Sequence, residues 1–258
     1  MNYTAEQTEK LHRKREEISR QLLSLGLEGM SQAREVEDEE ARKYLNHGVG
    51  RRLSVLKYST EEIFSIFPPE RDQILTRDEV TAVQIYLHAF VINLSGVFEN
   101  WAWAFIHRHK LSDEVGDVRN VGLFKTNTQR FLPDNLRNYL TSKSISTWHD
   151  EYLKSYRDAL AHRIPLYVPP AALSDEEGEK YERLEVEKAR LFREQKWDRL
   201  DEVWAEQDQI GAPCAVFMHE FSADGRSRQV FLHPQVLSDC ITVVDFGTKF
   251  YEEWHSHA

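Results

Sequence analysis

The chain has 258 residues and a formal net charge of −10, because 43 acidic side chains outnumber 33 lysines and arginines. Hydrophobic residues make up 41% of it, which excludes collagen-like and disordered classes and allows a sizeable core. Two cysteines, Cys214 and Cys240, are too few for a disulfide framework or a four-cysteine zinc site. The acidic total also argues against a broadly basic nucleic-acid binder. Since the first residues are polar and charged, we expect no secretory signal and a soluble, cytoplasmic protein.

Helix signals dominate the N-terminal part of the chain, residues 1–58. A capping box at Thr4 predicts a helix over about residues 5–24, with Gly26 after its end. A second helix is predicted from residue 31 to about residue 46, stopping near Gly48. This part should supply helices that pack around the centre of the fold.

The most apolar stretch of the chain follows a second capping box at Thr76 and covers residues 82–106. Its length would suit a membrane span, but polar side chains interrupt it throughout: Gln84, His88, Asn93, Ser95, Glu99 and Asn100. So many polar groups are incompatible with lipid exposure, and we therefore expect no membrane span. We predict the central helix of a bundle instead, within a core region over residues 77–165.

Residues 174–258 are predicted to hold a charged helix, a β-hairpin and a C-terminal helix. The helix, over about 175–208, carries 13 acidic and 7 basic residues, which is more than half of the net negative charge. Two β-rich runs separated by a turn at residues 223–226 predict the hairpin within 213–232. The fold class expected for the whole chain, 1–258, is a single mainly α domain, a helical bundle with a small C-terminal β-hairpin.

One segment stands out for its chemistry: Arg157 is followed directly by Asp158 and, five residues on, by His162. The bare spacing of an arginine and a histidine is not specific, because Arg42–His47 and Arg228–His233 repeat it. Only Arg157 is followed by an aspartate, and only Arg157 lies on a predicted amphipathic helix downstream of the long apolar helix. That earlier helix carries an acidic residue, Glu99.

This segment resembles the Arg-(Asn/Asp/His)-x3-His motif of the HEPN superfamily (higher eukaryotes and prokaryotes nucleotide-binding domain), and the resemblance covers roughly residues 77–165. It implies a HEPN-like helical bundle. Many members are metal-independent endoribonucleases with a composite site in a homodimer, and others are inactive RNA-binding or interaction modules. The resemblance implies catalytic roles for Arg157, His162 and Asp158. To substrate binding we assign Glu99, Arg163 and Tyr167. HEPN toxins often carry a tyrosine two residues after the histidine, where this chain has Ile164.

The residue types fit RNA cleavage without a metal or cofactor. Histidine suits proton transfer near neutral pH, and the arginine fork suits the negative charge that develops on phosphorus. On an ideal helix Arg157 and His162 differ by about 140° in direction and about 7.5 Å in height, so one copy aims them apart. The resemblance implies a site shared by two copies, and a two-fold interface would let both residue types line one groove. Residues 105–163 carry ten basic and seven acidic side chains, a local +3 that favours phosphate binding.

The leading hypothesis is a HEPN-like endoribonuclease that acts on RNA in defence or stress, forms a homodimer and has an antitoxin or other protein partner. The second hypothesis is a HEPN-like module without catalysis, which binds RNA, a nucleotide or a protein. The third is a helical scaffold that contacts another protein through the charged helix over 175–208. Under the last two, Arg157 is the structural ion-pair partner of Glu99 or Glu151.

Overall fold

The computed structural model describes residues 3–221 and 226–255, and within them it is mainly α-helical with one two-stranded antiparallel sheet. The predicted fold class, helical with a small C-terminal hairpin, is confirmed. The α-helices are α1 Ala5–Glu35, α2 Glu39–Lys43, α3 Gly50–Ile66, α4 Arg77–Arg108, α5 Ser112–Val115, α6 Thr126–Gln129, α7 Asp134–Thr141, α8 Lys143–Thr147, α9 Lys154–His162, α10 Asp175–Arg193, α11 Trp197–Gln207 and α12 Leu232–Glu252. Two π-helical segments, Tyr44–Val49 and Trp148–Leu153, join α2 to α3 and α8 to α9, and Val118–Asn120 forms a 3-10 turn.

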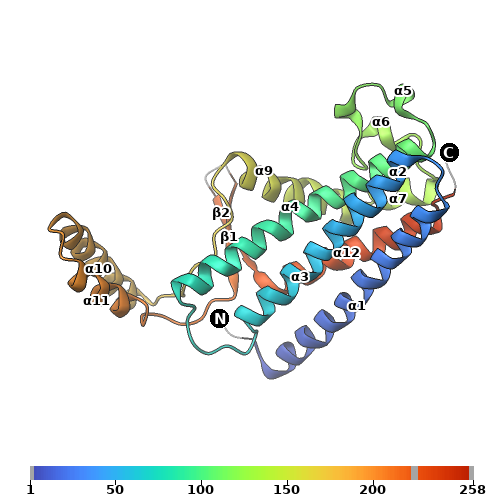
Figure 1. The fold of residues 1–258 in the computed structure, drawn as a ribbon. Coiled ribbons are helices and arrows are strands. Elements are labelled where there is room, and N and C mark those ends of the chain that lie inside the picture. The colour runs from blue at the N-terminus through green and yellow to red at the C-terminus, as the bar shows by residue number, and fades with distance from the viewer. Residues whose placement is uncertain (1–2, 222–225, 256–258) are drawn as a thin grey trace.

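The body of the molecule is built from the helices α1, α3, α4 and α12, which lie side by side (Figure 1). Helix α3 packs on α4 and on α1, and α1 packs along α12. Their apolar faces meet in one core that is dominated by aromatic rings: Trp101 and Phe105 of α4 and Phe246 and Phe250 of α12 have no exposed surface. Burial of such large side chains is the main source of stability in a bundle of this kind.

The polar side chains of α4 have distinct partners, which explains how an apolar helix can carry them. Gln84 accepts a hydrogen bond from the backbone N–H of Val168 at 3.2 Å, and His88 hydrogen-bonds the carbonyl of Leu166 at 2.9 Å. Among the described residues α4 is the one helix long and apolar enough to cross a membrane by length and composition. Its packing against α2, α3 and α9 is that of a core helix.

The N-terminal helices differ from the predicted ones at both glycines. Helix α1 begins at the predicted capping box but continues through Gly26 to Glu35. The predicted stop near Gly48 is also wrong, because the π-helix Tyr44–Val49 leads without interruption into α3. A mid-helix glycine costs only about 1 kcal/mol, and the packing of the long helices exceeds that cost.

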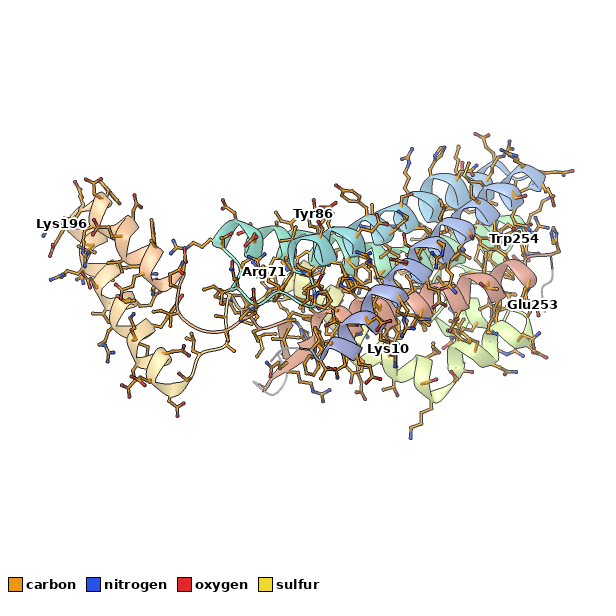
Figure 2. All side chains as sticks on the ribbon, turned by 90° about the horizontal axis from the view of Figure 1, so that it is seen from below. Lys10, Arg71, Tyr86, Lys196, Glu253 and Trp254 are labelled. Carbon is orange, nitrogen blue, oxygen red and sulfur yellow. The ribbon has the colours of Figure 1, made fainter. Side chains whose placement is uncertain are left out.

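The charged region forms a helical hairpin rather than the single helix predicted over 175–208. Helix α10 ends at Arg193, and Gln195, at a φ of 55°, turns the chain into α11. The two helices bury their apolar stripes against each other in a small separate cluster: Leu184, Leu191, Leu200, Val203 and Ile210. Figures 1 and 2 show this arm projecting from the body, with Lys196 at its tip.

The β-hairpin pairs β1 Val216–Phe221 with β2 Arg226–Phe231, with Val216 opposite Phe231. The turn, predicted at residues 223–226, lies almost wholly outside the described residues. Tyr167 and Met218 exchange two backbone hydrogen bonds of 2.7 and 3.1 Å, so the segment after α9 lies along the free edge of β1. This pairing fixes the end of α9 over the body.

Candidate functional site around Arg157

Helix α9, which carries the motif, is held by its apolar face. Tyr156 and Ala159 are each 1% exposed, and the Tyr156 ring meets Phe217 and His219 of β1 edge-on, at 5.5 and 5.0 Å between centroids. Since α9 is regular from Lys154 to His162, fixing Tyr156 also fixes the direction of its neighbour Arg157.

Arg157 lines a pocket of about 200 Å³ between α4, the loop before α6 and the π-helix Trp148–Leu153. Asp150, Lys154 and Arg157 recur every three to four residues and therefore share one helix face, which forms one wall. The lining residues are Ser95, Phe98 and Glu99 of α4, the loop residues Val121 to Lys125, and His149, Asp150, Leu153, Lys154 and Arg157.

The structure brings Arg157, Asp158 and Glu99 together. The Nε and Nη2 atoms of Arg157 donate hydrogen bonds of 3.1 and 2.7 Å to Oδ1 of Asp158, and Nη1 lies 3.6 Å from Oε1 of Glu99. The Arg157 side chain is 40% exposed, so solvent and ligands reach it. A structural ion pair of Arg157 was predicted with Glu99 or Glu151, and in the structure Glu99 is the partner. Asp158 orients the guanidinium.

His149 is part of this pocket, although sequence reasoning did not select it. Its ring stacks on Phe124 at 3.8 Å between centroids, and its Nδ1 donates a 2.8 Å hydrogen bond to Oδ1 of Asp150. Burial lowers the pKa of His149 below its ordinary value, more than Asp150 raises it. A histidine that is mostly neutral at pH 7 can accept a proton. The only signal in the sequence was its position about two helical turns before Arg157.

His162, Arg163 and Tyr167 lie outside the pocket. His162 ends α9 and is exposed, as is Arg163, whose backbone N–H donates to the carbonyl of Ala159 at 3.0 Å and closes the helix. Tyr167 is 49% exposed and pairs with β1. Within one chain Arg157 and His162 thus face different surroundings, as helix geometry requires.

The pocket is anchored to α12 through a buried carboxyl group. Trp148 at the start of the π-helix donates from Nε1 to Oδ1 of Asp239 at 2.8 Å, and Gln235 donates to the same oxygen at 2.8 Å. Burial raises the pKa of Asp239 to about 7. A second tie joins α9 to β1, where Ser155 Oγ and His219 Nε2 share a 2.8 Å hydrogen bond.

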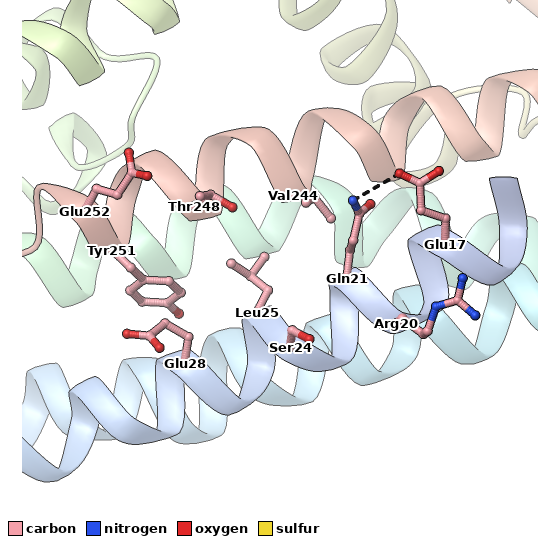
Figure 3. Close-up of a pocket in the computed structure, with 10 residues that line it drawn as sticks. All are labelled: Glu17, Arg20, Gln21, Ser24, Leu25, Glu28, Val244, Thr248, Tyr251 and Glu252. Carbon is pink, nitrogen blue, oxygen red and sulfur yellow. Dashed lines mark hydrogen bonds between the residues drawn. The ribbon is translucent and has the colours of Figure 1, made fainter.

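Another groove of the body lies between α1 and α12 and measures about 640 Å³ (Figure 3). Glu17, Glu28 and Glu252 line it, and Gln21 donates a 3.2 Å hydrogen bond to Glu17. Its carboxylates make this groove unsuited to phosphate groups. In the described part of the chain, no three His, Cys, Asp or Glu side chains are placed to hold a metal ion together.

No family model, curated protein or solved structure matches this chain.

Proposed function

We propose that this protein is a HEPN-like, metal-independent endoribonuclease, soluble and cytoplasmic, whose active site is shared by two copies in a homodimer. The observation that carries the proposal is the pocket that Arg157, Lys154 and Lys125 line, with His162 exposed at the end of the same helix. These three cationic groups outnumber the two carboxylates that line the same pocket, Glu99 and Asp150, which favours the negatively charged backbone of RNA. A role in defence or stress, with an antitoxin as a protein partner, follows from the family resemblance alone.

The chemistry assigns a role to each residue. His162 accepts the proton of a ribose 2′-hydroxyl, whose oxygen attacks the adjacent phosphorus while the bond to the 5′-oxygen breaks and that oxygen takes up a proton. Arg157 stabilises the negative charge on the phosphoryl oxygens, and Asp158 with Glu99 holds Arg157 in place. Arg163 and Tyr167 contact RNA beyond the cleaved bond.

A homodimer supplies the geometry that one chain lacks. Because His162 lies outside the pocket of its own chain, the histidine of a second copy must approach the Arg157 pocket of the first. A two-fold axis beside α9 would place both residue types in one groove.

A non-catalytic RNA-binding module is the alternative, and a specific contact favours it. The Arg157 guanidinium already donates two hydrogen bonds to Asp158 and lies beside Glu99, as in a structural ion pair. The projecting arm favours the third function, protein interaction: Phe192 and Trp197 are 61% and 53% exposed at its turn.

The test is RNA cleavage in EDTA by the wild type and by Arg157→Ala, His162→Ala and Arg42→Ala. The last is a matched control, since Arg42 is an exposed arginine with the same spacing to a histidine. We expect cleavage by the wild type and the control, and a loss of at least about 100-fold in the other two. Equal RNA decay in all four samples would exclude the nuclease function, and RNA bound but uncut would favour the binding module.

Mixing the two inactive variants tests the composite site. After equilibration of Arg157→Ala with His162→Ala, half of the dimers are mixed and each has one intact site, so activity should return to about a quarter of the wild-type value. A mixture that stays inactive, although mixed dimers form, would contradict a shared site.

A further inference from the structure

A second pocket lies on the opposite side of α4 and is built around Arg52 of α3. It measures about 480 Å³, and the residues that line it are Glu40, Lys43, Tyr44, His47, Gly48, Arg51, Arg52, Asn93 and Asn100. On α4 the residues Asn93, Gly96 and Asn100 recur every three to four positions, so they form one stripe that faces the π-helix Tyr44–Val49 and α3.

The Arg52 guanidinium is fixed by neutral amides. Its Nε donates to Oδ1 of Asn100 at 2.8 Å, and its Nη1 donates to Oδ1 of Asn93 at 3.2 Å. In the described part of the chain Arg52 makes no ion pair with a carboxylate. The two hydrogen bonds use two of its five N–H donors, and the positive charge stays uncompensated.

Two glycines make room for this arrangement. A Cβ atom at Gly96 would lie 2.2 Å from Cζ of Arg52, and a Cβ atom at Gly48 would lie 2.8 Å from the side chain of Asn100. The guanidinium therefore lies directly on the backbone of α4. Such close approach fixes its direction, so its donors are held in place before any ligand arrives.

The charges around the pocket favour an anion. Glu40 lines the pocket with a carboxylate, but Lys43 pairs with it at 2.8 Å and also lies 3.1 Å from Glu39, so Lys43 adds no net positive charge. Arg51 donates to Nδ1 of His47 at 3.3 Å and, like Arg52, makes no ion pair within the described residues. Two arginines without carboxylate partners match the double charge of a phosphate monoester.

An aromatic wall stands beside these arginines. The ring of Tyr44 lies nearly parallel to those of Trp103 and His107, at centroid distances of 5.7 and 5.5 Å and interplanar angles of 11° and 16°. Tyr44 also lines the pocket. Flat rings held in this way are suited to stacking against a nucleobase.

We infer that this pocket binds the phosphate monoester of a nucleotide, with Arg52 and Arg51 on the phosphate and Tyr44 against the base. A free nucleoside monophosphate and a 5′-phosphorylated RNA end carry this same chemistry. The inference does not depend on the function proposed for Arg157, because the two pockets share no residue.

The decisive variant is Asn100→Asp, which keeps an acceptor oxygen for Arg52 but adds a negative charge. By calorimetry on the full chain we expect AMP to bind the wild type with a Kd below about 1 mM, adenosine to bind much more weakly, and Asn100→Asp to bind AMP at least about tenfold more weakly. Asn138→Asp, an exposed site on α7 with the same charge change, is the control and should bind as the wild type does.

Gly96→Ala supplies a second test that adds no charge. Its methyl group would push the Arg52 guanidinium off the backbone, so AMP binding should fall while thermal unfolding shows that the fold persists. Short RNAs with a 5′-phosphate or a 5′-hydroxyl, added to the same variants, tell an RNA end from a free nucleotide. If neither AMP nor 5′-phosphorylated RNA binds the wild type, or if Asn100→Asp and Asn138→Asp weaken binding equally, the inference is overturned.

Discussion

Helix α4 separates two pockets, each of which has an arginine and a π-helical turn, and the two arginines are held in opposite ways. Arg157 is bound by carboxylates, with Asp158 at 2.7 Å and Glu99 at 3.6 Å, whereas Arg52 is bound by the amide oxygens of Asn93 and Asn100. π-Helical turns often occur at functional sites. Because the two pockets share these features, their different hydrogen-bond partners indicate different functions.

A carboxylate partner and an amide partner both orient an arginine, but they leave it with different charge. A phosphate that approaches Arg157 must compete with Asp158, while one that approaches Arg52 meets an uncompensated cation. We therefore expect the Arg52 pocket to bind a ligand without reacting with it. We expect the Arg157 pocket to act on a substrate that neighbouring cationic side chains bind. Lys125 and Lys154 are placed for that second task.

The largest expected effect is on the pH dependence of stability, and it comes from Asp239, the buried carboxyl group that joins the Arg157 pocket to α12. The pKa of Asp239 rises from 3.8 to about 7 in the fold, so the folded state binds its proton more tightly than the unfolded state does. The contribution of Asp239 to the free energy of unfolding is complete below about pH 4, and it is lost as the pH rises through 7. At about 1.4 kcal/mol per pKa unit, the loss is about 4 kcal/mol.

Asp239→Asn should remove this loss, since an amide can still accept from Trp148 and Gln235. In urea unfolding, the variant should gain up to about 4 kcal/mol over the wild type between pH 4 and pH 8. Asp245→Asn, exposed on the same helix, should show no such gain. His233 changes the free energy of unfolding in the opposite direction. Burial lowers its pKa to about 4, so the stability that neutral His233 contributes is lost as the pH falls below 6.5. If the free energy of unfolding of Asp239→Asn depends on pH in the same way as that of the wild type, Asp239 does not titrate in this range.

Local signals in the sequence located much of the fold. The capping boxes at Thr4 and Thr76 begin helices where predicted, because a cap depends on residues only three positions apart. The helix ends were less predictable. Gly48 lies inside a continuous helical path because its missing side chain admits Asn100 from α4, a contact that no local pattern records.

The arm was missed for a related reason. A single helix and a hairpin over residues 175–208 have the same composition, and only the mutual burial of Leu191 and Leu200 favours the hairpin. The narrow apolar stripe on each half was the available signal, and it is what a two-helix pair requires.

The candidate site was predicted in part. An ion pair of Arg157 with Glu99 or Glu151 was expected, and the structure has Glu99 as the partner. His149 and Arg52 were not selected, because each acquires meaning only from a residue distant in sequence: Phe124 for the first and Asn100 for the second. The polar residues within the apolar helix were visible, but the sequence does not show which partner each has.

An effect of intermediate size is expected from Asp158→Asn, which should change RNA binding and RNA cleavage in opposite directions. Asp158→Asn removes the charge that competes with phosphate but weakens the hold on the guanidinium. We expect RNA to bind a few-fold more tightly and cleavage to fall by about tenfold or more, measured by fluorescence anisotropy and by single-turnover assay. If both quantities fall together, Asp158 contributes to substrate binding; if neither changes, it does not position Arg157.

The smallest expected effect comes from Glu99→Gln, which makes the Arg157 pocket more like that of Arg52. The Glu99 side chain is 54% exposed and 3.6 Å from Arg157, so the free energy of unfolding should change by no more than about 0.5 kcal/mol. RNA affinity should nevertheless rise, most clearly at low salt, because one negative charge leaves the pocket wall.

Glu151→Gln is the matched control: it makes the same change on an exposed residue of the π-helix Trp148–Leu153 that does not line the pocket. If the two variants change the affinity and its salt dependence equally, the effect belongs to net charge and not to the pairing of Arg157. A rise confined to Glu99→Gln would show that its carboxylate partners are what distinguish Arg157 from Arg52.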